Sequence, residues 1–529
     1  MRREWRIARA AMALGLLPCF GSALAQAQAP PAPLPLPDAR GATLPSTENL
    51  AYDIQTALMS QPTSGPEGST PINLAAALKL AGATPLDIAA ATARVEQAVG
   101  LLIQAKALKI PNLNGGIGYY RHDGVNQNLF TGQIFQKGSN GVQLGGGPTI
   151  NLGLTDAIFA PLAAKRVVAS RDADVQSARN NVLNTVAQYY FNLQEAKGRL
   201  VGAEATIVRA ERLVGFAERL APSLIAPLEI NRARAQLENV RQFRETALND
   251  WRVASAQLAE ILLLEPMLLL DPIEPPFLRV GLIPPGCEPD QLVRIALGAR
   301  PEIASQRQLL IAAEQQLKRE KSRPFLPNLV LSTPGTANAG VLPAGQFYGG
   351  ANGSLNGTGS RADFSAALYW QLNNGGMGNV GLIKQAKGNR NAAEIEVTRT
   401  LFRVRSEVAQ ALARVQTSEA RVPRAEIELK EAIQSADKNF VGLRETTRPA
   451  GELLSLVVRP QEVVAALQAL NQAFQDYASA VSTYNRAEFE LYRAIGRPAQ
   501  WVTSLQQAVV PLGPVGLAPA PPAGPEVGR

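Results

Sequence analysis

A heptad repeat of apolar residues extends from Val182 to Ala217 and constrains this chain more than any other feature. Its members alternate at spacings of four and three for about five heptads, which predicts a supercoiled helix. The same pattern recurs at a constant offset in the second half, from Val404 to Ala436. Because a globular core does not require so long a seam, the repeat predicts long helices packed along their whole length. The first seam comprises Val182, Val186, Tyr189, Leu193, Ala196, Leu200, Ala203, Ile207, Ala210, Val214 and Ala217.

Two further segments show the same spacing and match each other at a second constant offset. Arg244 interrupts the first of them, opposite Tyr477 in the second. Large residues alternate with alanine in both, which allows helices to approach closely. We expect these segments to return along the long helices, with seams at Ala233, Leu237, Val240, Ala247, Trp251, Ala254 and Leu258, and at Ala466, Leu470, Ala473, Ala480, Tyr484, Ala487 and Leu491.

The lengths of the helical segments predict how they stack. Residues 157–221 form an uninterrupted helical pattern, which is roughly 100 Å of helix at 1.5 Å per residue. The flanking segments, 73–109 and 230–263, are each a little more than half as long. Placed end to end, they reach about the height of the long helix. We therefore expect two shorter helices beside each long one, with the Pro-rich residues 266–288 as an irregular belt near mid-height.

Each half of the chain also contains segments with a period of two. Residues 142–154 place apolar side chains on one face and polar or glycine residues on the other, and residues 362–372 do likewise. A strand of about this length crosses a membrane at a tilt. Pro111 and Pro327 end helices and introduce a second strand in each half. The expected strands are 111–121, 142–155, 327–333 and 362–373, with loops at 122–141 and 334–361; soluble hairpins remain an alternative.

Four strands cannot span a bilayer alone, because their open edges would leave backbone groups without hydrogen bonds in hydrocarbon. Closure therefore needs further copies of the chain. Two copies would give eight strands and an interior filled by side chains, whereas three would give twelve strands and a water-filled lumen. Aromatic and apolar residues of the strands are candidates for lipid contact or for an interfacial girdle: Tyr119, Tyr120, Val142, Leu144, Ile150, Leu152, Phe364, Leu368 and Trp370.

The two ends of the sequence are typical of processing segments and linkers. Residues 1–25 combine arginines with a short apolar run and Ala23-Leu24-Ala25, which predicts a secretory signal peptide. Cys19 leaves lipidation open, although Pro18 fits a lipidation motif poorly. Residues 26–71 and 499–529 are Pro-rich and predict a linker and a tail. Between them we expect two repeats, residues 72–265 and 289–498, joined by the belt.

The composition argues against most kinds of chemistry. His122 is the single histidine, so a His-rich zinc site cannot be assembled, and we interpret His122 as a solvated loop residue. Cys287 alone remains after signal cleavage. Cleavage removes four arginines and one glutamate, so the formal net charge falls from +8 to +5. Such a mild excess does not indicate nucleic-acid binding. Gly145-Gly146-Gly147 precede a strand pattern rather than a helix, so they do not form a phosphate loop. We expect no enzyme activity and no cofactor.

Four groups of sequence stretches together carry a family pattern: TPLDIAAATARVEQA with IPNLNGGIGYY, RPEIASQRQLLIAAEQQL with LPNL, YWQLNNGG, and QAFQDYASAVSTYNRAEFELYRAIGRP. On these stretches, nearly all of the expected mature chain resembles the TolC-type outer membrane efflux protein family. The resemblance implies a homotrimer in the cell outer membrane, with a twelve-stranded β-barrel, four strands per chain, that continues as a periplasmic α-helical barrel. It also implies docking to a periplasmic adaptor and an inner membrane transporter, for drug efflux or for type I protein secretion.

The same resemblance implies a constriction at the periplasmic helix tips, formed partly by acidic side chains. Asp437 and Glu445 are the candidates here, and three-fold symmetry would make each a ring of three carboxylates. Ala221, Pro222, Gly442 and Gly451 are the candidate adaptor-docking tips. The second tip is longer than the first, which distinguishes it from the family pattern. The alternative from a different class is an extracytoplasmic coiled-coil scaffold without a pore.

Overall fold

The computed structural model describes residues 68–83, 85–128, 130–220, 225–283, 286–332, 344–351, 354–362, 364–443, 446–447, 455–456 and 458–496. The expected signal peptide, almost all of the N-terminal linker and the C-terminal tail lie outside them. Helices dominate the described part, and their lengths match in pairs. The pairs are α4 (Leu154–Leu220) and α8 (Met377–Gly442), with 67 and 66 residues; α3 (Leu86–Ala107) and α7 (Pro301–Ser322), with 22 each; α5 (Pro227–Ile261) and α9 (Pro460–Ala494), with 35 each; and the shorter α2 (Leu74–Ala83) and α6 (Pro289–Ala299).

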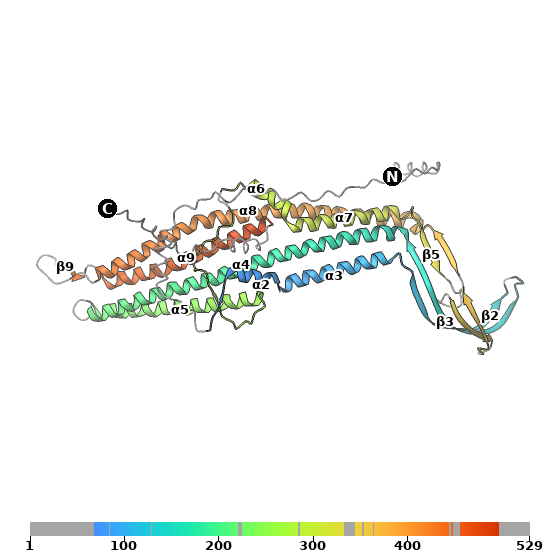
Figure 1. Cartoon of the computed structure of the whole chain (residues 1–529), viewed down its shortest axis with the longest axis horizontal. Coiled ribbons are helices and arrows are strands. Elements are labelled where there is room, and N and C mark those ends of the chain that lie inside the picture. The colour runs from blue at the N-terminus through green and yellow to red at the C-terminus, as the bar shows by residue number, and fades with distance from the viewer. Residues whose placement is uncertain are drawn as a thin grey trace, which may run out of the picture. The chain divides into compact units, whose positions relative to one another are not determined.

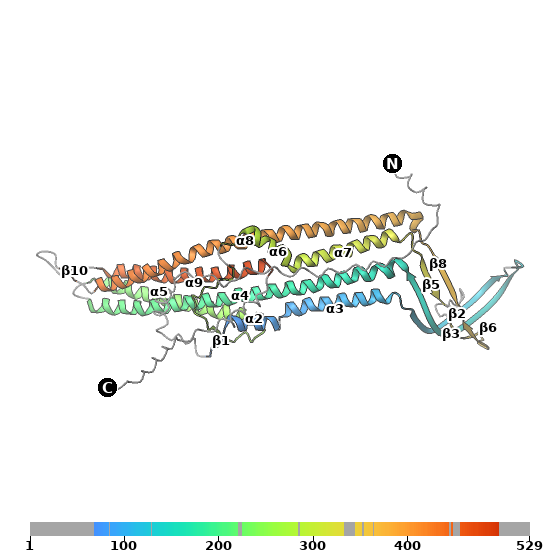
Figure 2. The ribbon, with the colours of Figure 1, turned by 45° about the horizontal axis from the view of Figure 1, so that its top comes forward.

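The helices run side by side, with two shorter helices placed end to end along each long one (Figure 1). In the half nearest the sheet, α3 packs against α4, α4 against α7, and α7 against α8. In the other half, α5 packs against α4, α4 against α9, and α9 against α8 (Figure 2). This layer, four helices across in each half, is the stacking expected from the segment lengths.

The heptad seams form the interior of the layer. Every predicted seam residue of α5 and α9 is buried, including Trp251 at 1% exposure and Leu491 at 0%. On α4, seam positions such as Leu193 are fully buried, whereas Tyr189, Leu200, Ile207 and Val214 are half-buried. The prediction that the seams lie between packed helices is therefore confirmed, and burial of these apolar side chains is the main stabilising contribution along the helices.

The stretch Leu74–Ala107 is apolar and long enough to cross a membrane by length and composition. It comprises two helices, α2 and α3, with Pro85 as the N-cap residue of α3. Both helices pack against α4. The stretch is thus part of the helical layer.

The residues that follow α5 lie across the middle of the helical layer and form hydrogen bonds with α5 and α9. Strand β1 (Thr70–Ile72) pairs in parallel with β4 (Leu270–Pro272). The Trp251 Nε1 atom donates a hydrogen bond of 3.0 Å to the Leu270 carbonyl oxygen. Further along, Asn485 of α9 accepts from the Val280 amide at 2.9 Å and donates to the Leu278 carbonyl at 2.7 Å. These contacts fix the irregular segment against α5 and α9.

One sheet lies at the end of the layer where α3, α4, α7 and α8 meet it (Figure 1). Its central strand is β3 (Ile134–Gly153), and β2 (Asn112–Gln127) pairs antiparallel along one edge of it. Along the other edge of β3 lie β5 (Asn328–Ser332) and β6 (Ala344–Ala351), one after the other. Beyond them, β8 (Ser365–Tyr369) pairs with β5, and β7 (Gly357–Ala362) pairs with β6. The sheet is therefore four strands across.

Strand β6 and nearly all of β7 lie within a segment, 334–361, that the sequence pattern assigned to a loop. The assignment was wrong because this segment is rich in glycine and lacks apolar alternation, whereas its pairing depends on the free edge of β3. Gly345 has φ of +147°, and a Cβ atom there would lie 2.1 Å from the Leu144 carbonyl oxygen. Glycine is needed where the strands approach this closely. Strands β2 and β3 are also longer than expected.

Candidate channel wall and constriction

The strand register gives the sheet two chemically different faces. Residues paired directly across strands share a face, so Ile117 of β2, Leu144 of β3 and Gln346 of β6 lie together. We call this the apolar face. It carries Leu113, Ile117, Tyr119, Val142, Leu144, Pro148, Ile150, Leu152, Leu329, Leu331, Tyr348 and Leu368.

The opposite face, which we call the glycine-rich face, carries small and polar residues. Gly141 and Gly349 lie there beside Phe347, whose ring occupies the space that Cβ atoms at both glycines would fill, at 2.8 and 2.6 Å. Gln143 is buried at 2% exposure on this face. Side chains of this size leave room on the inner side of a curled sheet. The other members include Asn114, Gly116, Gly118, Gly145, Gly147, Thr149, Asn151, Gly357 and Gly359.

The candidate lipid-facing residues fall mostly on the apolar face. Tyr119, Val142, Leu144, Ile150, Leu152 and Leu368 lie there by register. Tyr120 follows Tyr119 in β2 and therefore lies on the glycine-rich face, paired with Gly141. Phe364 and Trp370 flank β8 and are 75% and 58% exposed. The Trp370 Nε1 atom donates a hydrogen bond of 3.2 Å to the Phe325 carbonyl oxygen.

Both outer edges of the sheet are unpaired among the described residues. Strand β2 pairs with β3 alone, and β8 and β7 pair with β5 and β6 alone. An open edge presents free backbone amides and carbonyls to its surroundings. A sheet with these two edges and an apolar face is suited to close with strands of another copy.

The candidate constriction residues lie near the helix ends farthest from the sheet. The Asp437 Oδ1 atom of α8 lies 3.5 Å from the Arg209 Nε atom of α4. Gly442 is buried at the end of α8. Glu445, Ala221, Pro222 and Gly451 lie outside the described residues. In the tip that follows α8, β9 (Thr446–Thr447) pairs antiparallel with β10 (Ser455–Leu456).

A buried ion-pair cluster joins helices at mid-height, and the sequence pattern did not reveal it. The Arg300 side chain is 4% exposed and donates to Glu407 of α8 at 2.7 Å and to Glu302 at 3.1 Å. Burial raises the pKa of the Glu302 carboxyl, but the Arg300 guanidinium outweighs this and holds that pKa below its ordinary value. The cluster links the α6–α7 junction to α8 through Glu407, and to α9 because Arg300 also donates to the Ala494 carbonyl at the end of α9.

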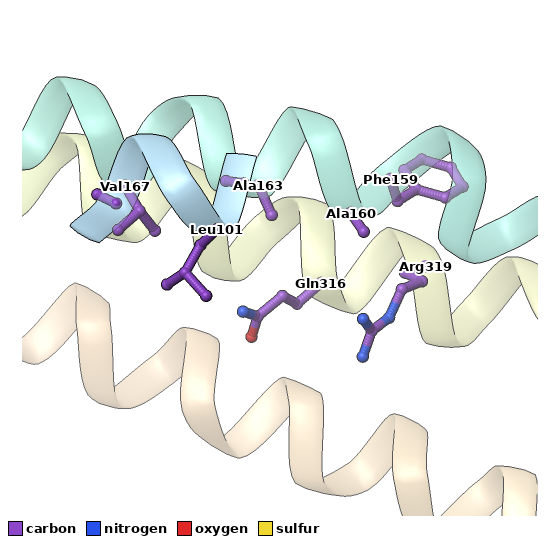
Figure 3. A pocket seen from close by; sticks show the side chains of 9 residues that line it. Leu101, Phe159, Ala160, Ala163, Val167, Gln316 and Arg319 are labelled. Carbon is purple, nitrogen blue, oxygen red and sulfur yellow. The ribbon is translucent and has the colours of Figure 1, made fainter. Parts of the chain in front are cut away.

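A groove of about 190 Å³ lies between α3, α4 and α7, and Figure 3 shows its lining. Leu101, Ala163 and Val167 make most of its surface apolar, while Gln316 and Arg319 lie at its polar side. Arg319 is held by Asp156 at 3.6 Å and by Glu320 at 2.9 Å. No group of three or more His, Cys, Asp or Glu residues that could hold a metal occurs in the part of the chain described here. This groove is an apolar surface feature without converging reactive groups.

Comparison with known proteins agrees with this architecture. Residues 77–262 match the family model of outer membrane efflux proteins. The outer-membrane channel OprN is 18% identical over 81% of this chain and 90% of its own, with a TM-score of 0.63. VceC from Vibrio cholerae is 18% identical over 80% of this chain and 96% of its own, with a TM-score of 0.61. The CmeC outer membrane channel of Campylobacter jejuni is 17% identical over 82% of this chain and 90% of its own, with a TM-score of 0.61.

None of the curated protein sequences matches this chain. The family match confirms the resemblance drawn from the sequence over residues 77–262, and the structural matches show the same fold over most of the chain. The mainly helical architecture with a curled sheet is thereby confirmed. The similar proteins named here are outer membrane proteins, and none is described as an enzyme.

Proposed function

On the premise that this chain resembles the outer membrane efflux proteins, we propose that it forms an efflux-type channel in the cell outer membrane. The observation that carries the proposal is the sheet itself. It is four strands across, apolar on one face, small and polar on the other, and open at both edges. The helical layer continues it with four helices across. In the proposed channel the apolar face forms the lipid-facing wall, the glycine-rich face lines a wet lumen, and the helical layer forms the periplasmic duct.

Closure by three copies fits the chemistry of the two faces best. Twelve strands enclose a lumen, whereas eight leave an interior filled by side chains. The many glycines on the glycine-rich face supply too little side-chain volume to fill such an interior. The same three copies would set twelve helices around the duct. The unpartnered flanks of the layer, α3 and α5 on one side and α8 on the other, would meet between copies.

The helix tips are the proposed docking site for a periplasmic adaptor and an inner membrane transporter. This part of the proposal rests on the family resemblance and concerns Gly442 together with Ala221, Pro222 and Gly451. Asp437 is the proposed constriction residue among those the structure describes, and Glu445 is a second candidate. Drug efflux and type I protein secretion use the same duct geometry. Deleting the gene and measuring both drug sensitivity and secreted proteins would separate them.

Membrane insertion and assembly provide the test of the proposed function. The full chain, expressed with its leader, should require detergent for extraction, run as a trimer in mild detergent, and conduct ions in planar bilayers. A pore-free coiled-coil scaffold would instead be released by osmotic shock. A monodisperse monomer, or a trimer that never conducts, would overturn the proposal.

A further inference from the structure

Exposed basic residues gather on all four helices where they approach the sheet. Lys109 follows the end of α3, and Lys165 lies on the early turns of α4. At 1.5 Å per residue, these cations lie within roughly 20 Å of the helix ends that adjoin the strands. We name the set the basic collar. Its members are Lys106, Lys109, Lys165, Arg166, Lys318, Lys321, Lys384 and Lys387, all exposed.

The collar carries far more positive charge than nearby acidic residues compensate in the part of the chain that the structure describes. Two nearby carboxylates are already neutralised, because Asp156 pairs with Arg323 at 3.1 Å and Glu320 with Arg319 at 2.9 Å. Glu314 of α7 is one carboxylate against the eight basic residues of the collar. None of the collar lysines forms an ion pair among the described residues, and Arg166 donates to the neutral Gln308 at 3.3 Å. The excess positive charge is thus free to interact with an external anion.

On each helix, exposed apolar residues lie between the strands and the basic residues of the collar. On α4, Ile158 is 46% exposed and precedes Lys165 by seven residues. On α8, Met377 and Val380 are 75% and 60% exposed and precede Lys384 and Lys387 by the same spacing. Residues seven apart share a helix face. The same face therefore changes from apolar beside the strands to basic about two turns away.

The other two helices repeat this order at their ends. Phe325, 79% exposed, lies between Lys321 and β5, and Ile110, 65% exposed, lies between Lys109 and β2. A surface that is apolar and then basic matches the boundary of a bilayer, where hydrocarbon gives way to phosphate headgroups. Lysine stems reach toward such a boundary while the ammonium groups stay in the headgroup layer.

From this geometry we infer that the basic collar binds anionic phospholipid headgroups in the periplasmic leaflet around the barrel. The inference rests on the proposed function, because it requires the sheet to span the membrane. Each basic residue near an anionic surface contributes about a fivefold preference, and the attraction decays within a Debye length, about 8–10 Å at moderate salt. Three copies would surround the barrel with this charge.

Lipid competition around the inserted protein tests the inference. The full chain with Trp5→Phe and Trp501→Phe is reconstituted in vesicles with brominated phosphatidylglycerol or brominated phosphatidylcholine. Tryptophan quenching then reports which lipid lies next to Trp370. Trp251 is buried among the helices and contributes a constant background. We expect roughly fivefold or greater preference for phosphatidylglycerol at low salt. The preference should disappear in 1 M salt, where the Debye length is about 3 Å.

A matched pair of variants assigns the effect to the collar. Lys318→Gln, Lys321→Gln, Lys384→Gln and Lys387→Gln together remove the collar residues of α7 and α8, the helices that adjoin Trp370, and should lower the preference measured there about fivefold or more. Arg421→Gln, Arg424→Gln, Lys430→Gln and Lys438→Gln, on the half of α8 far from the sheet, should leave it unchanged.

Three outcomes would overturn the inference. Equal quenching by both lipids in a conducting, inserted trimer would do so without affecting the channel proposal. A preference that is undiminished in the collar variant would place the lipid contact elsewhere. Failure to insert into either vesicle would overturn both proposals.

Discussion

The Arg209 Nε atom of α4 lies 3.5 Å from the Asp437 Oδ1 atom of α8, which joins the two long helices near their ends. The Asp437 side chain is 60% exposed and that of Arg209 is 25% exposed. An ion pair this exposed contributes at most about 1 kcal/mol to stability. The importance of Asp437 therefore lies in its exposed carboxylate near the proposed constriction rather than in holding the fold.

Asp437→Asn should lower the preference of the channel for cations and weaken block by multivalent cations. Carboxylates around a narrow passage attract cations, and the substitution removes one from each copy. Reversal potentials in planar bilayers under a salt gradient measure the effect, and the trimer yield should not change. Glu428→Gln, an exposed change elsewhere on α8, serves as the control. Unaltered selectivity and block would place the constriction at other residues.

Leu193→Asp should abolish assembly, whereas Leu200→Asp should reduce it less. Leu193 is fully buried at 0% exposure, and Leu200 is half-buried beside the same core. A buried charge without a partner costs several kcal/mol, and the cost falls where water reaches the group. Trimer yield after detergent extraction measures both variants, with Arg212→Asp at an exposed position of α4 as control. Equal yields for the two leucine variants would contradict the burial pattern.

Gly202→Ala should destabilise the helical layer, whereas Gly215→Ala should not. A Cβ atom at Gly202 would lie 2.6 Å from the Phe474 Cβ atom, so α4 and α9 would have to separate. Overpacking of this kind costs about 1–3 kcal/mol. A Cβ atom at Gly215 meets nothing within 4 Å, and alanine there gains up to about 1 kcal/mol of helix propensity. Denaturant midpoints that shift equally for both variants would refute the close approach.

Glu488→Gln should flatten the decline of thermal stability as the pH rises above 4.5. Burial raises the pKa of the Glu488 carboxyl above its ordinary value of 4.5, although the Leu282 and Ile283 amides donate to it. The folded state therefore holds the proton more tightly than the unfolded chain. Stability from this group is complete at low pH and is lost as the pH rises through the raised pKa.

Apparent melting temperatures measured from pH 4.5 upward test this sign. Glu302 has the opposite behaviour, because its pKa is lowered and its contribution is lost only as the pH falls below 4.5. Glu302→Gln should therefore lower stability without changing the slope in this range. A wild-type slope that survives in Glu488→Gln would assign the titration to another group.

The amino-acid sequence by itself determined the elements with strong periodicity. The seams through Leu237 and Leu470 are buried as the heptads predicted, since a 3.5-residue period leaves one stripe to exclude from water. The alternation through Val142 and Leu144 likewise placed apolar residues on one face of β3, because side chains in a strand alternate strictly. These are local patterns, and the geometry of a single helix or strand is enough to place their apolar residues on one side.

The tertiary structure decided what depends on contacts between distant segments. Strand β6 forms in a glycine-rich stretch because the free edge of β3 supplies its hydrogen-bond partners, and β7 then pairs with β6. Arg300 donates a hydrogen bond to Glu407, which lies 107 residues later in the chain. Gly202 of α4 packs closely against Phe474 of α9. The hydrophobic periodicity of the sequence does not predict such pairs. They arise when packing brings the helices together, because burial then requires each charge to find a partner and each close approach to find a residue without a side chain.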